Sequence, residues 1–328
     1  MATQAQLVVC YSLGTGAGFD NFLAGFSRQL SEDFAECLAL HDGFITVPQM
    51  ILVNEKDDIT YDVAKNASAF AVFYSLPETR WIVDATRSIG GNLALTGRVL
   101  DDETGVLLSI NVVDVNKNVL LFCGCETADR ESLHVALAKL AARLLSHFTD
   151  RSEQNWLPDV WTMLGTQSFH AYVNWMRLRE AERRAQREGL PSPADRLVEH
   201  ACYALVADPD YARASDKLCQ LLARELKSST YAFVVKNLEP LSTHSSAIAL
   251  AYAQCLARLG QRAEAEAHLS NVIRKFPDEP LFPLLRACLT QDDRIMSADL
   301  SASQRAFGNA FDRMKSLVES SILNVNGV

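Results

Sequence analysis

The sequence lacks the features of several protein classes. No apolar run approaches the roughly 20 residues that a membrane-spanning helix needs. The most apolar stretches, such as Val106 to Val115, are about as long as a strand. The amino terminus has no basic segment followed by a long apolar one, so it does not resemble a signal peptide. These absences predict a cytoplasmic protein with no membrane insertion.

Basic residues are nowhere in large excess. The chain of 328 residues holds 31 Lys and Arg against 40 Asp and Glu, for a formal net charge of −9. Residues 1–150 contain 10 basic and 19 acidic residues, which leaves 21 of each sign in residues 151–328. Because an acidic or balanced surface does not attract a phosphate backbone, we expect no nucleic acid partner. The change of charge also favours a domain boundary near residue 150.

Motifs for catalysis and for metal binding are scarce. There is no Gly-x-Ser-x-Gly elbow and no His-Glu-x-x-His pair, and the seven histidines are isolated. The loop from Gly14 to Gly18 lacks the third glycine of a dinucleotide-binding fingerprint. Cys123 and Cys125 have no second Cys or His pair nearby, so two core thiols are favoured over a zinc site. We therefore predict no catalytic residue, no cofactor and no metal site.

The eight cysteines are scattered along the chain, mostly within apolar segments. This distribution is typical of free thiols in a reducing compartment rather than of a disulfide framework.

The first half of the sequence predicts an α+β domain, with a mixed sheet and packed helices. Apolar runs and turn residues mark the strands, and apolar spacing of three to four residues marks the helices. The expected strands are 7–13, 44–47, 92–100, 106–115 and 119–126, and the expected helices are 19–40, 59–73, 78–89 and 130–148. The last three strands have short connections, which favours an antiparallel meander.

The second half predicts an all-α domain of helical hairpins. Pro209 and Pro277 lie 68 residues apart, which is twice the period of about 34 residues of a tetratricopeptide (TPR) hairpin. Residues 246–279 fit that repeat best, with Ala253, Gly260 and Ala265 where small residues and a turn are needed. Residues 212–245 form a degraded unit. A last unit is expected to begin at residue 280 and to lose the repeat pattern near Thr290. A capping helix is expected over residues 304–323.

The chain resembles the TolB amino-terminal-like α/β module that precedes TPR repeats in bacterial proteins. The resemblance rests on the first strand, on Phe22-Leu-Ala-Gly-Phe26, and on Ile89-Gly-Gly-Asn-Leu-Ala-Leu-Thr-Gly-Arg-Val99. It covers about residues 5–148. It implies a TolB-like domain over residues 1–150, followed by a TPR-like helical-repeat domain with a capping helix over residues 151–328. It also implies a sensory or interaction role for the pair of domains.

The resemblance further implies which residues line a groove for a partner. In TPR arrays the first helix of each hairpin forms the concave surface. Carried over to this sequence, the partner-binding positions are Arg213, Asp216, Gln220, Arg224, Leu250, Gln254 and Arg258. The arginines suit a peptide carboxylate or an acidic segment, although the same positions also suit a solvated helix face.

Three functions follow from the sequence. The first is a non-enzymatic adaptor or scaffold for signalling or assembly, whose partner is another protein, a peptide segment or a second copy of the chain. The second is a small-molecule sensor with its ligand between the α/β and helical domains. The aromatic residues at that junction are Trp156, Trp161, Phe169, Tyr172 and Trp175, and aromatic residues serve in ligand pockets and in plain interfaces alike. The third, an enzyme of unrecognised type, rests on fold analogy alone.

Overall fold

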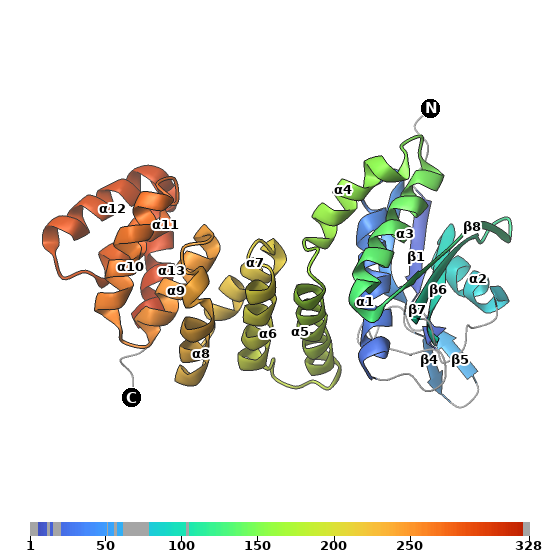
Figure 1. Ribbon diagram of the computed structural model, residues 1–328, viewed down its shortest axis with the longest axis horizontal. Helices are drawn as coiled ribbons and strands as arrows, with labels where there is room; N and C mark the ends of the chain where they lie inside the picture. The colour runs from blue at the N-terminus through green and yellow to red at the C-terminus, as the bar shows by residue number, and fades with distance from the viewer. Residues whose placement is uncertain are drawn as a thin grey trace. The chain divides into compact units, whose positions relative to one another are not determined.

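The structure is a computed structural model, shown in Figure 1. It describes residues 6–11, 14–15, 21–50, 52–55, 58–61, 79–102 and 105–323. The chain divides into two compact units, Met1–Pro191 and Ser192–Val328. This division comes after Pro191 rather than near residue 150, because the two helices that follow residue 150 pack on helices of the α/β region.

The first unit is built on a mixed sheet with the strand order β3-β1-β6-β7-β8, and β2 pairs with β6 outside this path. The strands are β1 (Gln6–Tyr11), β2 (Gly14–Thr15), β3 (Phe44–Met50), β6 (Leu93–Asp102), β7 (Gly105–Asp114) and β8 (Val119–Ala128). β1 runs parallel to β3 and β6, whereas β6, β7 and β8 form an antiparallel meander. The sheet confirms the predicted α+β class and the expected meander.

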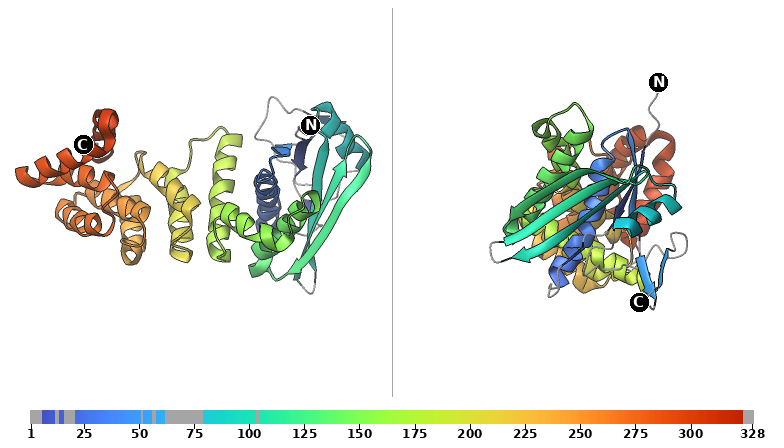
Figure 2. Two further views of the ribbon diagram at one scale, coloured as in Figure 1. Left: turned by 90° about the horizontal axis from the view of Figure 1, so that it is seen from above. Right: turned by 90° about the vertical axis from the view of Figure 1, so that its right-hand side faces the viewer.

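Helices cover one face of this sheet and part of the other (Figure 2). The helices of the unit are α1 (Asn21–Leu38), α2 (Thr79–Ser88), α3 (Leu133–Phe148), α4 (Glu153–Leu164) and α5 (Phe169–Arg187). α1, α3 and α4 contribute to the larger core on one face, and α2 covers part of the other face. α5 packs on α1 and α3. The side chains of β7 alternate accordingly, with Val106, Leu108, Ile110 and Val112 buried against the larger core.

One expected helix of the first unit is wrong where the structure describes it. Residues 58–61 belong to strand β5 (Asp58–Tyr61), which pairs with β4 (Leu52–Glu55) in a separate antiparallel ladder. The sequence Ile59-Thr60-Tyr61 consists of β-branched and aromatic residues, which favour strands. The remainder of that expected helix, residues 62–73, lies outside the described residues.

The second unit is helical throughout its described residues, which confirms the predicted all-α class. Its helices are α6 (Ala194–Ala207), α7 (Ala212–Leu222), α8 (Ser228–Leu238), α9 (Ser246–Arg258), α10 (Arg262–Lys275), α11 (Leu281–Leu289), α12 (Asp293–Phe307) and α13 (Phe311–Leu323). α9 packs on α7, α8 and α10, and α10 packs on α11. Within the described residues α7 and α8 barely touch each other, because both pack on α6 and on α9 instead.

The hairpin of α9 and α10 has the small residues and the turn that the repeat pattern predicts. Ala253 and Ala265 are fully buried. Gly260 has φ +77°, a conformation that glycine adopts without strain.

The two predictions for the end of the chain were less accurate. A helix, α12, begins at Asp293, where the Asp292 side chain accepts hydrogen bonds from the first backbone N–H groups. The expected capping helix is broken at Gly308, which has φ +53°.

None of the helices in the described ranges combines the length and the apolar character that crossing a bilayer requires.

Candidate functional site

The predicted groove residues lie on two neighbouring helices of the second unit. α7 carries Arg213, Asp216 and Gln220, with Arg224 just beyond its end, and α9 carries Leu250, Gln254 and Arg258. α7 and α9 pack side by side, so the structure brings the two rows together. Asp216, Gln220 and Arg224 are exposed, whereas Arg213, Leu250 and Gln254 are half-buried. This face, called the α7/α9 face below, is therefore mostly polar and accessible.

Arg258 differs from the other residues of the α7/α9 face because it is buried, with only 8% of its surface exposed. Its Nε is buried without a hydrogen-bond acceptor. Its guanidinium carbon lies 5.9 Å from the centre of the Tyr231 ring, on α8. In the described part of the chain no carboxylate forms an ion pair with Arg258. A buried cation without an anionic partner carries a desolvation cost that is only partly offset.

Two local features offset part of the charge of Arg258. The residue ends α9, where the helix dipole favours a cation, and the Tyr231 ring presents its negative face. Burial raises the pKa of Tyr231 and the positive charge of Arg258 opposes that rise, so the tyrosine stays neutral. The Tyr231 hydroxyl donates to the backbone oxygen of Arg224 at 3.4 Å. Tyr231 thus contacts the guanidinium of Arg258 and the backbone of Arg224, whose side chain is exposed.

Three thiols on α6, α7 and α9 are not reactive. Burial raises the pKa of Cys219 to about 11 and also raises that of Cys202 and Cys255. Because the thiolate is the reactive form, these groups act as small apolar side chains at neutral pH. All eight cysteines are free.

The prediction for two cysteines was wrong. Cys123 and Cys125 are exposed rather than part of the core, because they project from β8 on the face opposite to α3.

The five aromatic residues of the predicted ligand site all belong to the first unit. Trp156 is buried in the core, and its indole Nε1 donates to the Thr149 hydroxyl at 2.9 Å. Tyr172 is 1% exposed, and its hydroxyl donates to the Asp33 carboxylate. Trp161 and Trp175 are half-buried on α4 and α5. Phe169 begins α5, and all five residues precede the boundary between the units at Pro191. Trp156 and Tyr172 are engaged in core packing and hydrogen bonds.

His134 is a buried residue of α3. It is 4% exposed, and its Nε2 lies 2.7 Å from the backbone oxygen of Gln167. Its ring lies against the rings of Trp161, Phe169 and Tyr172. Its Nδ1 is buried without a partner, and burial lowers its pKa, so the imidazole is neutral at neutral pH.

A buried polar network joins α1 and α5 and was not visible in the sequence. Arg183 is 8% exposed and donates to the Gln29 side chain at 2.7 Å and to the Glu32 carboxylate. It also lies 3.5 Å from the Glu180 carboxylate. Gln29 donates in turn to Asp33, which accepts from Tyr172. The partners of Arg183 on α1 are more than 150 positions away in the chain, so no local pattern could reveal them.

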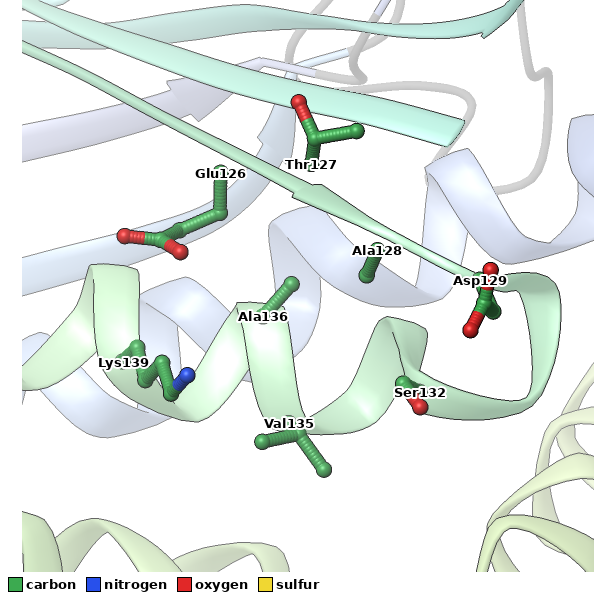
Figure 3. Close-up of a pocket in the computed structure, with 8 residues that line it drawn as sticks. All are labelled: Glu126, Thr127, Ala128, Asp129, Ser132, Val135, Ala136 and Lys139. Atoms are coloured by element: carbon green, nitrogen blue, oxygen red, sulfur yellow. The ribbon is translucent and has the colours of Figure 1, made fainter. Parts of the chain in front are cut away.

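The first unit also contains an open pocket of about 390 Å³ between β8 and the start of α3 (Figure 3). Its lining residues are Glu126, Thr127, Ala128, Asp129, Ser132, Val135, Ala136 and Lys139. Most of these side chains are polar or charged. Among the described residues no group of three or more His, Cys, Asp and Glu side chains is arranged to hold a metal ion.

Comparison with known proteins adds little to this geometry. No protein-family profile matches the chain, and no curated protein matches its sequence. Among solved structures, the crystal structure of TolB from Acinetobacter baumannii aligns with a TM-score of 0.29 and 14% identity. The alignment covers 45% of this chain and 29% of that one. The likeness to TolB is thus weak, and the function has to be argued from the residues.

Proposed function

We propose that this protein is a non-enzymatic adaptor or scaffold that holds an acidic segment of another polypeptide on the α7/α9 face. The observation that carries the proposal is the buried, unpaired guanidinium of Arg258. A carboxylate from a partner would supply the anion that the described chain does not. The TPR-like character of the second unit and a role in signalling or assembly are part of the same proposal.

Physical reasoning favours a carboxylate over a neutral ligand. The guanidinium is planar and binds a carboxylate with two parallel hydrogen bonds, which are stronger than bonds between neutral groups. Arg258 is already held by burial and by the Tyr231 ring, so binding would cost little side-chain entropy. Arg224, an exposed residue of the α7/α9 face, adds a second positive charge.

The remaining residues of the α7/α9 face suit a peptide backbone. Gln220 and Gln254 carry amide groups that both donate and accept hydrogen bonds, as the peptide groups of an extended segment require. Leu250 offers half-buried apolar surface. An acidic segment with one apolar residue would therefore match the charge and the chemistry of this face.

Display selection from a random peptide library tests this proposal. The selection uses the full chain, the Arg258→Met variant, and Arg274→Met as a control that removes an exposed arginine from α10. We expect peptides rich in Asp and Glu, which lose at least tenfold in affinity for Arg258→Met, about 1.4 kcal/mol. The control should bind them like the wild type. Peptides without acidic residues, or equal binding to Arg258→Met, would contradict the proposal.

The small-molecule sensor has no observation in its favour. Two of its aromatic residues, Trp156 and Tyr172, are engaged in the core of the first unit. A metabolite that raised the melting temperature and lost its effect in Trp175→Ala would revive it.

A further inference from the structure

Cys123 and Cys125 differ from the other cysteines of the chain in their exposure. Both are exposed, whereas the other six are buried or half-buried. Cysteine is among the residues most often found inside proteins, and an accessible thiol is open to metals and to oxidants. Two exposed thiols on one strand are therefore an unusual feature of a protein surface.

The two thiols lie next to each other on one face of the sheet. They are two positions apart in β8, so both side chains project from the face opposite to α3. Figure 3 shows Thr127, which follows them on the same face, pointing away from α3. In a strand of regular rise, the Cα atoms of two such residues are about 6.8 Å apart.

The strand between the two thiols is held in place by its own chain. The register of β8 with β7 is unbroken across both cysteines. On the α3 side the space beside Gly124 is filled, because a Cβ there would lie 2.8 Å from the ring of Phe122 and 3.1 Å from Leu140. Arg143 of α3 reaches the backbone oxygen of Cys125 at 3.5 Å. The spacing of the two thiols is therefore fixed before any ligand binds.

This spacing suits a bridging metal ion better than a disulfide. A disulfide needs Cβ atoms about 3.5–4.5 Å apart, which is closer than two residues on one face of a regular strand can bring them. A bond between a metal and a thiolate is about 2.3 Å long, so an ion between two thiolates holds the sulfurs about 4.6 Å apart. Rotation about the two Cα–Cβ bonds brings the sulfurs to that separation without a change of the backbone.

The number and the softness of the ligands select the ion. Zinc takes four ligands, and among the described residues no group of three or more His, Cys, Asp and Glu side chains could hold a metal. Thiolates favour soft ions, and Cu(I) is a soft ion that is stable with two ligands. We propose that Cys123 and Cys125 bind one Cu(I) ion as a pair of thiolates. Each thiol releases its proton to solvent as its bond to copper forms.

The neighbouring strands supply polar groups and a positive charge on the same face. Ser109 of β7 lies opposite Cys125, and Asn111 lies opposite Cys123. Their side chains can donate hydrogen bonds to the thiolates, as the groups around metal ligands commonly do. Arg98 of β6 lies opposite Ser109 and is exposed. Two thiolates with one Cu(I) ion carry a net negative charge, which this arginine offsets in part.

The first experiment titrates the full chain with Cu(I) under argon, in competition with bicinchoninate, a coloured Cu(I) chelator. We expect one ion per chain, and roughly a hundredfold weaker binding in Cys123→Ser or Cys125→Ser, because each variant keeps a single thiolate. Cys219→Ser is the matched control, because it removes a half-buried thiol of the second unit, and it should bind copper like the wild type. Excess Zn(II) should not displace the Cu(I). The site lies in the first unit and does not depend on Arg258.

The second experiment records the X-ray absorption of copper in the loaded wild type and compares the mass of the chain with and without copper by sedimentation equilibrium. We expect two sulfur ligands in a linear arrangement and a mass that copper leaves unchanged. Equal copper affinity of the wild type and either serine variant at these two positions would overturn the proposal. A third sulfur ligand, copper held only between two chains, or an internal disulfide in place of copper binding would overturn it as well.

Discussion

Arg183 in the first unit and Arg258 in the second are equally buried, each with 8% of its surface exposed, yet their surroundings differ. Arg183 meets two carboxylates, those of Glu32 and Glu180, and the amide of Gln29. Arg258 meets only the ring of Tyr231 within the described structure. Burial alone therefore does not reveal the role of an arginine. The presence or absence of an internal anion separates an arginine that holds the fold from one that, in our proposal, binds the carboxylate of a partner.

The largest effect should come from removing the paired arginine. Arg183→Met leaves Glu32 poorly solvated without its cation, so we expect the free energy of unfolding of the first unit to fall by about 3–5 kcal/mol. All four tryptophans lie in the first unit, so their fluorescence in a urea titration reports on it directly. Arg184→Met is the control, because that side chain is exposed and should change stability by at most about 0.5 kcal/mol. Equal effects of the two substitutions would show that the network has no structural role.

The next effect concerns the hydroxyl that joins the same network. Tyr172→Phe removes the hydrogen bond to the Asp33 carboxylate and leaves that buried group with one donor fewer. Hydrogen bonds to charged groups contribute roughly 1.5–3 kcal/mol, so a loss of stability in that range is expected. The tryptophan signal again provides the measurement. A change below about 0.5 kcal/mol would mean that water replaces the hydroxyl without cost.

Removing the unpaired arginine should alter stability least among these three substitutions. Arg258→Met deletes a buried charge that has no carboxylate partner in the described structure and removes its contact with the Tyr231 ring. The free energy of unfolding should therefore change by at most about 1 kcal/mol in either direction. Circular dichroism is the suitable probe, because residues 192–328 contain no tryptophan. If Arg258→Met lowered the free energy of unfolding as much as Arg183→Met does, Arg258 would have a structural role. The contrast between the two arginines would then not hold.

The smallest effect is a pH dependence that both units share. Burial lowers the pKa of His134 in the first unit and of His268 in the second. The unfolded chain therefore binds protons more readily, with a pKa near the ordinary value of about 6.5. The contribution of these two neutral histidines to the free energy of unfolding is fully present above that pH. It is lost as the pH falls below it toward the folded pKa values. Unfolding titrations of His134→Gln should show a weaker decline of the tryptophan transition between about pH 6.5 and 5. If the decline were unchanged in His134→Gln, the pH dependence could not be attributed to His134.

The sequence predicted much of the architecture, because local patterns determine it. The three strands of the meander and the helix after them follow from apolar periodicity and turn residues, and all four are present with small shifts of their ends. The turn at Gly260 and the buried Ala253 and Ala265 follow from the repeat spacing. The strand at 58–61 was missed because a short apolar stretch does not distinguish helix from strand.

The site was predictable only in part. The resemblance to TPR arrays placed Arg258 among the predicted partner-binding residues, but its burial depends on how α8 and α9 pack. The pairing of Arg183 with Glu32 joins helices that are far apart in the chain, and no spacing reveals such a contact. Cys123 and Cys125 looked like core residues because the run around them is apolar. Their exposure follows from the place of β8 at an edge of the sheet, which only the topology shows.

The most direct test of the central claim observes the Arg258 guanidinium itself. Its Nε–H group can be followed by ¹⁵N NMR and assigned by the loss of its signal in Arg258→Lys. The full chain is titrated with an acidic peptide from the display selection and with the same peptide in which Asn and Gln replace Asp and Glu. We predict that the acidic peptide shifts the Arg258 signal and that the neutral peptide does not. Binding of the acidic peptide with an unchanged Arg258 signal would contradict the account.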